Sequence, residues 1–156
     1  MAESVVTDAM RAAIGVEGPP TIAEVTASGI RLFARAVGHA DPAFYDEAAA
    51  KERGYRGLLA PPGYLGTPVY RPGGRDPDEL GQRYEIPYKR ILNGGTTYEY
   101  MEPVVAGDVI TSRSRITEFR ERAGSMGPML ITYRETLFTR QDGKVVAKMR
   151  GNIINY

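Results

Sequence analysis

Cysteine and tryptophan are absent from this 156-residue chain, and histidine occurs once, as His39. Without cysteine the chain can form no disulfide, no thiolate metal site and no cysteine nucleophile. A single imidazole also argues against a metal centre built from several histidines. The sequence therefore predicts neither a metal nor another cofactor, and it fits the reducing conditions of the cytoplasm.

Long apolar runs and strong net charge are missing as well. No stretch approaches the roughly 18 apolar residues of a transmembrane helix. The N-terminal residues MAESVVTDAMRAAIG lack the basic start and the uninterrupted apolar core of a signal peptide. The formal net charge is only +1, so no strong field attracts nucleic acid or an anionic membrane. We therefore expect a soluble, cytoplasmic protein that binds neither.

The composition is that of one globular domain. Hydrophobic residues make up 42% of the chain and charged residues 25%, which are ordinary values for a folded domain. A domain of this length buries about 70% of the surface of its unfolded chain, enough for a single core. We therefore expect residues 1–156 to form one domain, in which residues 1–15 are an N-terminal helical extension closed by Gly15.

Helical signals come first along the chain. After a short predicted strand over residues 21–25, Thr26 can cap a helix that runs to Val37, with apolar residues at helical spacing. The pair Asp41-Pro42 favours one helical turn, because proline suits the first position of a helix. A polar helix is predicted over residues 47–53 and a buried apolar helix over residues 64–70. The apolar positions that precede Gly38 are Ile30, Phe33, Ala34 and Val37.

Strand signals dominate after about residue 86, beyond a polar loop predicted over residues 71–83. Residues 96–101 place Tyr98 and Tyr100 on one face of a strand, and a long strand is predicted over residues 109–120. Two later strands flank the hairpin signal Asp142-Gly143. These elements predict an α+β fold with about five antiparallel strands around one buried helix. The alternating apolar residues are Met129, Ile131, Tyr133 and Leu137 before the hairpin, and Val145, Ala147, Met149 and Ile153 after it.

Three segments resemble one known family. Residues 26–65 resemble the N-terminal region of MaoC-like dehydratases, also called fatty-acid-synthase-type dehydratases. Residues 92–116 (LNGGTTYEYMEPVVAGDVITSRSRI) resemble a strand, turn and strand of that family, and residues 141–156 resemble its last hairpin. The resemblance implies a hot-dog fold, in which a sheet wraps round a central helix, and pairing as a double hot dog. It also implies reversible hydration of 2-enoyl thioesters of coenzyme A or acyl carrier protein.

Hydration requires a polarised thioester carbonyl and a water held by an acid–base pair. Active members of the family resemble one another in a loop reading G-D-x-N-P-x-H, whose Asp and His share that water. The corresponding residues 38–44 read GHADPAF, so His39 fills the Asp position and Phe44 fills the His position. Because phenylalanine cannot carry a proton, the chain resembles the non-catalytic, acyl-binding half of a heteromer, to which a second MaoC-like chain brings the dyad.

His39 and Asp41 are the candidates for a rearranged acid–base pair. Each also has a structural interpretation, since His39 follows a helix C-terminus, where a partly charged imidazole is favoured. Asp41 precedes a proline, and an aspartate in that position commonly starts a helical turn. We therefore assign no catalytic residue firmly from the sequence.

Two glycine-containing segments are candidate substrate-binding sites. In residues 61–64 (PPGY), the N–H groups of Gly63 and Tyr64 are predicted to face the thioester oxygen, although Gly63 could instead serve close packing of helix and sheet. In Asn93-Gly94-Gly95, the glycines would let a pantetheine arm run along the strand edge, or they form a bulge in a curved sheet. Basic residues could bind coenzyme phosphates, although charged runs are usually solvated surface; these are Arg71, Lys89 and Arg90.

Three functions fit the sequence. The preferred one is an acyl-thioester-binding, non-catalytic subunit of a heteromeric (R)-specific 2-enoyl-CoA hydratase, or 3-hydroxyacyl-thioester dehydratase. The alternatives are a self-sufficient homodimeric enoyl-CoA hydratase that uses His39 and Asp41, and a non-enzymatic acyl-CoA-binding protein. A thioesterase ranks last, because the predicted helix over residues 64–70 contains no acid. The expected partners are an acyl-CoA or acyl carrier protein thioester and a second MaoC-like chain or another copy.

Overall fold

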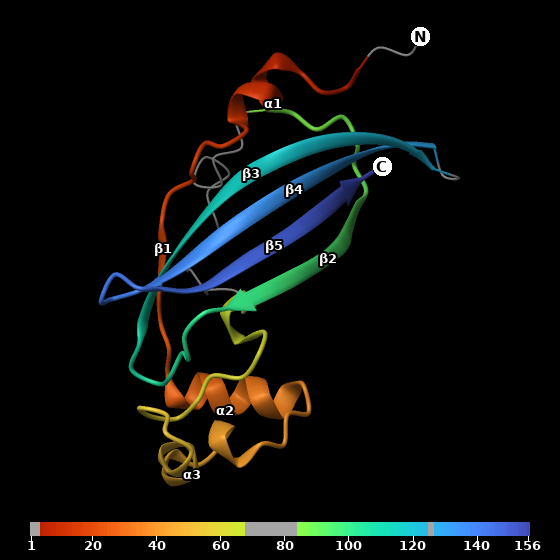
Figure 1. Ribbon diagram of the computed structural model, residues 1–156. Coiled ribbons are helices and arrows are strands. Elements are labelled where there is room, and N and C mark those ends of the chain that lie inside the picture. Colours follow the sequence, from red (N-terminus) through yellow and green to blue (C-terminus); the bar gives the residue numbers. More distant parts are fainter. Residues whose placement is uncertain (1–3, 68–83, 125–126) are drawn as a thin grey trace.

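Figure 1 shows the computed structural model, which describes residues 4–67, 84–124 and 127–156. Within these residues, five strands form one antiparallel sheet in the order β1-β3-β4-β5-β2. This confirms the α+β class and the number of strands predicted from the sequence. The strands are β1 (Thr21–Glu24), β2 (Ile91–Tyr100), β3 (Val109–Gly124), β4 (Gly127–Arg140) and β5 (Val145–Asn155).

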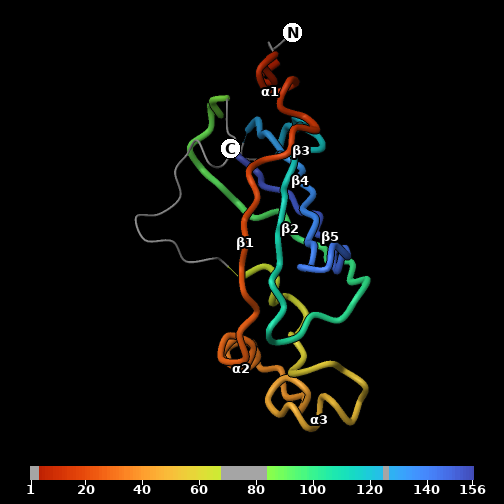
Figure 2. The backbone as a smooth tube through the Cα atoms, turned by 90° about the vertical axis from the view of Figure 1, so that its left-hand side faces the viewer, coloured from red at the N-terminus to blue at the C-terminus, as the bar shows by residue number. Residues whose placement is uncertain are grey.

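The helices lie beyond the two ends of the sheet. Both Figure 1 and Figure 2 show α2 and α3 at one end and α1 at the opposite end. Each α-helix begins after a residue whose side-chain oxygen accepts a backbone N–H of the first turn, so local chemistry places the helix starts. The caps and helices are Thr7 and α1 (Asp8–Ala13), Thr26 and α2 (Ala27–Ala36), and Asp46 and α3 (Glu47–Glu52). Two 3-10 turns, η1 (Pro42–Phe44) and η2 (Tyr64–Gly66), lie between or after them.

The main core lies where α2 and the following loops pack on the sheet. Ile30 and Ala34 of α2 are fully buried, as the apolar spacing predicts, but Val37 is 52% exposed. The prediction for Val37 is wrong because this residue is the C-cap of α2, where the helix and its apolar stripe end. The buried members of this core are Val25, Ile30, Ala34, Phe44, Leu58, Val104, Ile110, Phe138, Val146 and Ala147.

In β4 the prediction of the inward face is wrong. The alternating apolar residues were expected to face the core, but the opposite face of the strand is the buried one. Apolar side chains occur on both faces of this strand, so alternation alone does not decide which face turns inward. In β5, an irregularity opposite Thr139 buries Val146 together with Ala147 and leaves Val145 38% exposed. The buried set in β4 is Leu130, Thr132, Thr136, Phe138 and Arg140, whereas Met129, Ile131, Tyr133 and Leu137 are half-buried.

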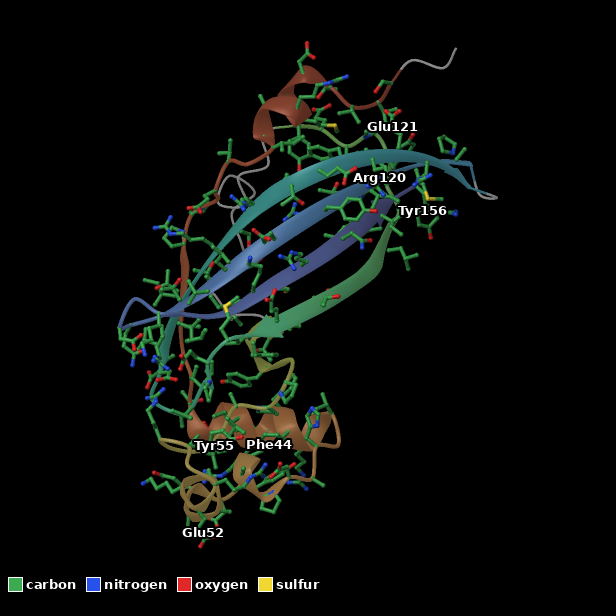
Figure 3. The ribbon with its side chains drawn as sticks, in the orientation of Figure 1. Phe44, Glu52, Tyr55, Arg120, Glu121 and Tyr156 are labelled. Atoms are coloured by element: carbon green, nitrogen blue, oxygen red, sulfur yellow. The ribbon has the colours of Figure 1, made fainter. Side chains whose placement is uncertain are left out.

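A second, smaller core lies at the α1 end of the sheet. It contains Met10, Tyr84 and Leu130. The carboxylate of Glu121 on β3 accepts N–H groups from Val5 and Val6, which ties the N-terminal extension to the sheet. Figure 3 shows Glu121 at this end of the molecule and Phe44 at the other.

The helix predicted over residues 64–70 is shorter in the structure, and none of its described residues is buried, so the prediction of a buried helix is wrong for residues 64–67. Only the turn η2 forms, and Thr67 is already extended, with φ −66° and ψ 136°. The cause is local, because Gly66 is a poor helix former and Thr67 precedes Pro68, which disfavours helical geometry at the residue before it. Residues 68–70 and the loop predicted over residues 71–83 lie outside the described residues. None of the described helices is long and apolar enough to cross a membrane.

Candidate functional site

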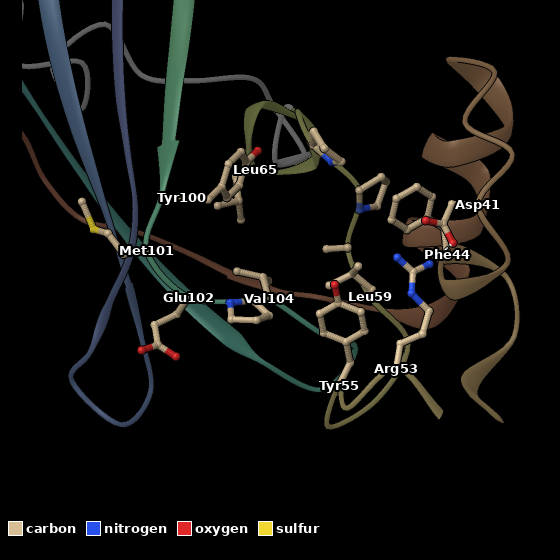
Figure 4. Close-up of a pocket in the computed structure, with 14 residues that line it drawn as sticks. Asp41, Phe44, Arg53, Tyr55, Leu59, Leu65, Tyr100, Met101, Glu102 and Val104 are labelled. Carbon is tan, nitrogen blue, oxygen red and sulfur yellow. Dashed lines mark hydrogen bonds and ion pairs between the residues drawn. The ribbon is translucent and has the colours of Figure 1, made fainter. Parts of the chain in front are cut away.

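A cleft of about 440 Å³ opens where the loops after α2 meet the end of β2 (Figure 4). Its walls come from four segments that are distant in sequence: residues 41–44, 53–55, 59–65 and 100–104. Most of these side chains are apolar, and the charged ones are Asp41, Arg53 and Glu102. An apolar cleft with a few polar groups is the usual form of a small-molecule site.

Phe44 forms part of the cleft wall and is also a core residue. It is only 7% exposed and belongs to the main core of the domain. Its ring packs edge-on against the His39 ring, with 5.6 Å between centroids. The side chain at this position therefore supplies packing and no proton.

The Asp41 carboxylate is engaged by two donors. Its Oδ1 accepts the Ala43 N–H at 2.9 Å, which caps η1, and the Arg53 Nη1 at 2.5 Å. Figure 4 shows the Arg53 guanidinium directed at Asp41 beside Phe44. The hydrogen bond from Arg53, followed by that from Ala43, holds the pKa of Asp41 below its usual value. A carboxylate stabilised in this way is a weak base.

His39 does not line the cleft. It follows the C-terminus of α2, where its N–H donates to the Ala34 carbonyl at 2.9 Å and its carbonyl accepts the Tyr45 hydroxyl at 2.6 Å. Across the described ranges, no hydrogen bond joins the His39 ring to Asp41. The structure thus shows both residues in the contacts of their structural interpretations, and a catalytic role for the pair stays a prediction.

Gly63 and Tyr64 lie between residues that line the cleft but do not line it themselves, and their N–H groups already have acceptors. Gly63 donates to the Tyr100 hydroxyl at 2.8 Å, and Tyr64 donates to the Pro61 carbonyl at 3.1 Å. Gly63 has a φ of 88°, which favours glycine, and an added Cβ would lie 3.3 Å from the Phe33 ring. A thioester oxygen could accept these N–H groups only if the present acceptors were displaced.

The segment Asn93-Gly94-Gly95 lies on β2, away from the cleft. The β2–β5 register shifts between Asn93 and Gly95, so the bulge predicted as the structural alternative is present. A Cβ at Gly94 would clash with the end of the Asn152 side chain, so a larger residue there would require Asn152 to move. The glycines border a second hollow of about 620 Å³ on the sheet, together with Thr97 and Arg150. A pantetheine contact at this segment stays a prediction.

Lys89 and Arg90, two of the basic residues considered for phosphate binding, do not line either hollow. The Arg90 guanidinium lies over the Tyr156 ring at 6.0 Å, and Lys89 is exposed beside it. Arg71 lies outside the described residues. Within those residues, no group of three or more His, Cys, Asp or Glu side chains could hold a metal ion.

Sequence reasoning missed three residues that shape this end of the molecule. Arg53 and Tyr100 pair with Asp41 and Gly63 across 12 and 37 positions, and no local pattern connects them. Asp108 is 1% exposed, and its carboxylate accepts the Val105 N–H at 2.9 Å and the Arg56 guanidinium at 3.0 Å. Asp108 thereby fixes the turn that follows the cleft residues 100–104.

Residues 12–149 match the family model described as FAS1-like, dehydratase domain region. The chain belongs to this family, which confirms the MaoC-like, fatty-acid-synthase-type dehydratase family predicted from the sequence. Among curated relatives, a UPF0336 protein of Streptomyces griseus is 39% identical over 116 residues, which cover 72% of this chain and 74% of that protein. A UPF0336 protein of Streptomyces coelicolor is 37% identical over the same shares of the two chains.

Solved structures share the fold, among them the following three. A chain of the HadBC (3R-hydroxyacyl-ACP dehydratase) complex from Mycobacterium tuberculosis is 24% identical, with a TM-score of 0.72, over 92% of this chain and 97% of that one. A chain of the ChsH1-ChsH2 complex from the same organism is 20% identical, with a TM-score of 0.75, over 90% and 84%. The R-hydratase PhaJ1 from Pseudomonas aeruginosa is 18% identical, with a TM-score of 0.65, over 91% and 81%. At these identities the likeness shows the hot-dog fold.

Proposed function

We propose that this chain is the non-catalytic, acyl-thioester-binding subunit of a heteromeric (R)-specific 2-enoyl-CoA hydratase, or 3-hydroxyacyl-thioester dehydratase. The observation that carries the proposal is Phe44, a buried core side chain at the loop position where the family's active members resemble one another in a histidine. Hydration needs a group there that exchanges a proton with the water, and a phenyl ring cannot do so. The dyad must then come from another chain.

The surroundings of Phe44 support the same conclusion. Asp41 is held as a carboxylate by Arg53 and Ala43, and His39 lies outside the cleft. Glu102 is the other carboxylate of the cleft lining, and Figure 4 shows it beside Met101 and Val104, on the side of the cleft away from Phe44. Neither Asp41 nor His39 is therefore poised to exchange a proton with a water beside Phe44. The apolar lining can still contribute a wall to an acyl-binding tunnel.

The edge strand β2 supports the presence of a second chain. In the described part of the protein β2 pairs on one side only, with β5, and every residue of it except Tyr98 is exposed. Ile91 is 70% exposed and Leu92 is 51% exposed at one end of this strand. An unpaired edge that also exposes large apolar side chains favours association with another chain.

The structural neighbours agree with a two-chain assembly. HadBC and ChsH1-ChsH2 are named as complexes of two proteins, and the chain that matches in each has the fold of this one. We infer that the partner is a MaoC-like chain that carries the dyad, and that the two chains associate along β2 as a double hot dog. The substrate would be a 2-enoyl thioester of coenzyme A or of acyl carrier protein.

The test compares the chain alone with the chain in its complex. The tagged chain is purified from its own host, and hydration of crotonyl-CoA is measured before and after any partner is removed. We expect no hydration by the chain alone and at least about 100-fold more with the partner, because acid–base catalysis contributes at least that factor.

Two other outcomes identify the alternative functions. A pure homomer that hydrates crotonyl-CoA and loses that activity on His39→Ala is a self-sufficient hydratase. Stoichiometric binding of acyl-CoA without turnover in every pairing identifies a non-enzymatic binder. Either outcome contradicts the proposed function.

A further inference from the structure

Three polar side chains on the core-facing side of the sheet have buried atoms without a hydrogen-bond partner. Among the described residues, the hydroxyls of Tyr84 and Thr132 and the Nε of Arg134 are buried and unpaired. Tyr84 is 8% exposed and Thr132 is 2% exposed, so neither hydroxyl lies at the protein surface. Buried polar groups in proteins almost always have a partner, and unpaired ones are therefore candidates for binding one.

The three side chains are neighbours in space. Thr132 and Arg134 are two positions apart on β4, so they project from the same face of the strand. Thr132 pairs with Phe119 of β3, and the Phe119 ring packs edge-on against the Tyr84 ring, with 5.2 Å between centroids. Tyr84 and Phe119 belong to the smaller core at the α1 end of the sheet, and none of the three polar residues lines the cleft.

Arg134 has no acid beside it on this face. Its cross-strand partner on β5 is Gly151, which has no side chain. The adjacent Glu135 projects from the opposite face of β4, where it pairs with Arg115 and Arg150. In the described part of the chain, Arg134 forms no ion pair. A partly buried guanidinium without an acid favours an anionic partner, because a buried charge is stable only when it is paired.

All three groups are hydrogen-bond donors at physiological pH. Burial raises the pKa of Tyr84, and the nearby Arg134 guanidinium opposes that rise only in part, so the phenol keeps its proton. The threonine hydroxyl and the guanidinium keep theirs as well. Together the groups offer three donors and one positive charge. A carboxylate matches this set, because it carries one negative charge and about four acceptor positions, and it pairs strongly with arginine.

We propose that Tyr84, Thr132 and Arg134 form a second binding site, which holds the carboxylate of a small monocarboxylic acid. Arg134 is only half-buried, so part of its side chain is open to an incoming acid. The site goes beyond the proposed function, since it shares no residue with the cleft and lies toward the other end of the sheet.

The test titrates the purified chain with butyrate and with butyramide, an uncharged probe of the same shape, and follows the arginine Nε–H signals by NMR. We expect butyrate to shift the Arg134 signal saturably, with one site per chain. Butyramide should bind at least about tenfold more weakly, because it cannot form the charge-assisted hydrogen bonds. Arg134→Gln should weaken butyrate binding by a similar factor. Arg150→Gln is the matched control and should leave it unchanged, since Arg150 pairs with Glu135 on the opposite face.

Two smaller substitutions separate binding from folding. Tyr84→Phe and Thr132→Val each remove one unpaired hydroxyl and keep the shape of the side chain. Neither should lower the free energy of unfolding of the free chain, but each should weaken butyrate binding about threefold or more. A lowered free energy of unfolding would mean that the hydroxyl is already paired within the chain, which contradicts the site.

The inference is also overturned by an absence of saturable butyrate binding, by equal binding of butyramide, or by unchanged binding in a folded Arg134→Gln chain. The hydration assay tests the proposed function separately. An active chain without a partner defeats that function and leaves the carboxylate site standing, whereas failure of butyrate to bind defeats only the site.

Discussion

The cleft and the edge strand β2 differ in two respects: how many of their polar groups have hydrogen-bond partners, and how far their apolar side chains are buried. In the cleft, Asp41 is paired with Arg53, the Gly63 N–H is bonded to Tyr100, and Phe44 is packed into the core. Along β2, backbone groups on one side have no strand partner among the described residues, and large apolar side chains are exposed.

The difference indicates where this chain meets other molecules. A site that performs acid–base chemistry keeps its polar groups available to substrate, and such groups often cost stability. Here the polar groups of the cleft are paired within the fold. The unpaired backbone groups and the exposed apolar side chains lie instead along β2. This difference supports the proposed role of the chain as a subunit that is completed by association.

The largest expected effect comes from removing the Phe44 ring, which packs into the core beside the cleft. Phe44→Ala should lower the free energy of unfolding by about 3–5 kcal/mol, because a buried phenyl ring leaves a cavity. Urea denaturation of the purified chain measures the change. Leu32→Ala, at a residue of α2 that is 69% exposed, should change the free energy of unfolding by less than about 0.5 kcal/mol. A decrease of less than about 1 kcal/mol in the free energy of unfolding for Phe44→Ala would show that the ring contributes little to packing. It would contradict the contrast drawn between the cleft and β2.

A smaller effect is expected from placing a charged side chain on the edge strand β2. Leu92→Lys should weaken association about tenfold or more, which corresponds to about 1.4 kcal/mol, because an unpaired ammonium would be desolvated in the interface. Analytical ultracentrifugation of the complex measures the dissociation constant. Ile22→Lys is the matched control, since Ile22 is 61% exposed on β1, at the opposite edge of the sheet. Equal effects of the two variants would remove β2 as the docking edge.

The smallest effect concerns the ion pair at the cleft. The pKa of Asp41 is lowered in the folded chain by Arg53 and Ala43, so its contribution to stability is present above its unfolded pKa, near pH 4, and is lost as pH falls through the lower folded value. Asp41→Asn should therefore reduce the loss of thermal stability between about pH 4 and pH 2. Melting temperatures across that range measure the difference, and parallel curves for the two proteins would show that the pair does not form in solution.

Sequence reasoning predicted the elements well where the determining contacts are local. Thr26 caps α2, and Asp41-Pro42 starts η1, because each side chain bonds a backbone N–H two or three residues ahead. It was less successful where apolar residues occur on both faces of a strand, as in β4, and where a neighbouring proline shortened the helix predicted over residues 64–70. It identified the family and the position of Phe44, but not Arg53 and Tyr100, the partners of Asp41 and Gly63.

The sequence by itself determined the absence of cysteine chemistry, the order of helices and strands, and the phenylalanine at position 44, because each depends on residue identity or on neighbours along the chain. That this phenylalanine stands where active members have a histidine is what the family resemblance implies. Only the tertiary structure decided that Arg53 pairs with Asp41, that Tyr100 accepts the Gly63 N–H, and that β2 is an edge. Those contacts join residues that are distant in sequence, and their partners are chosen by sheet order, register and bulges, which no short pattern encodes.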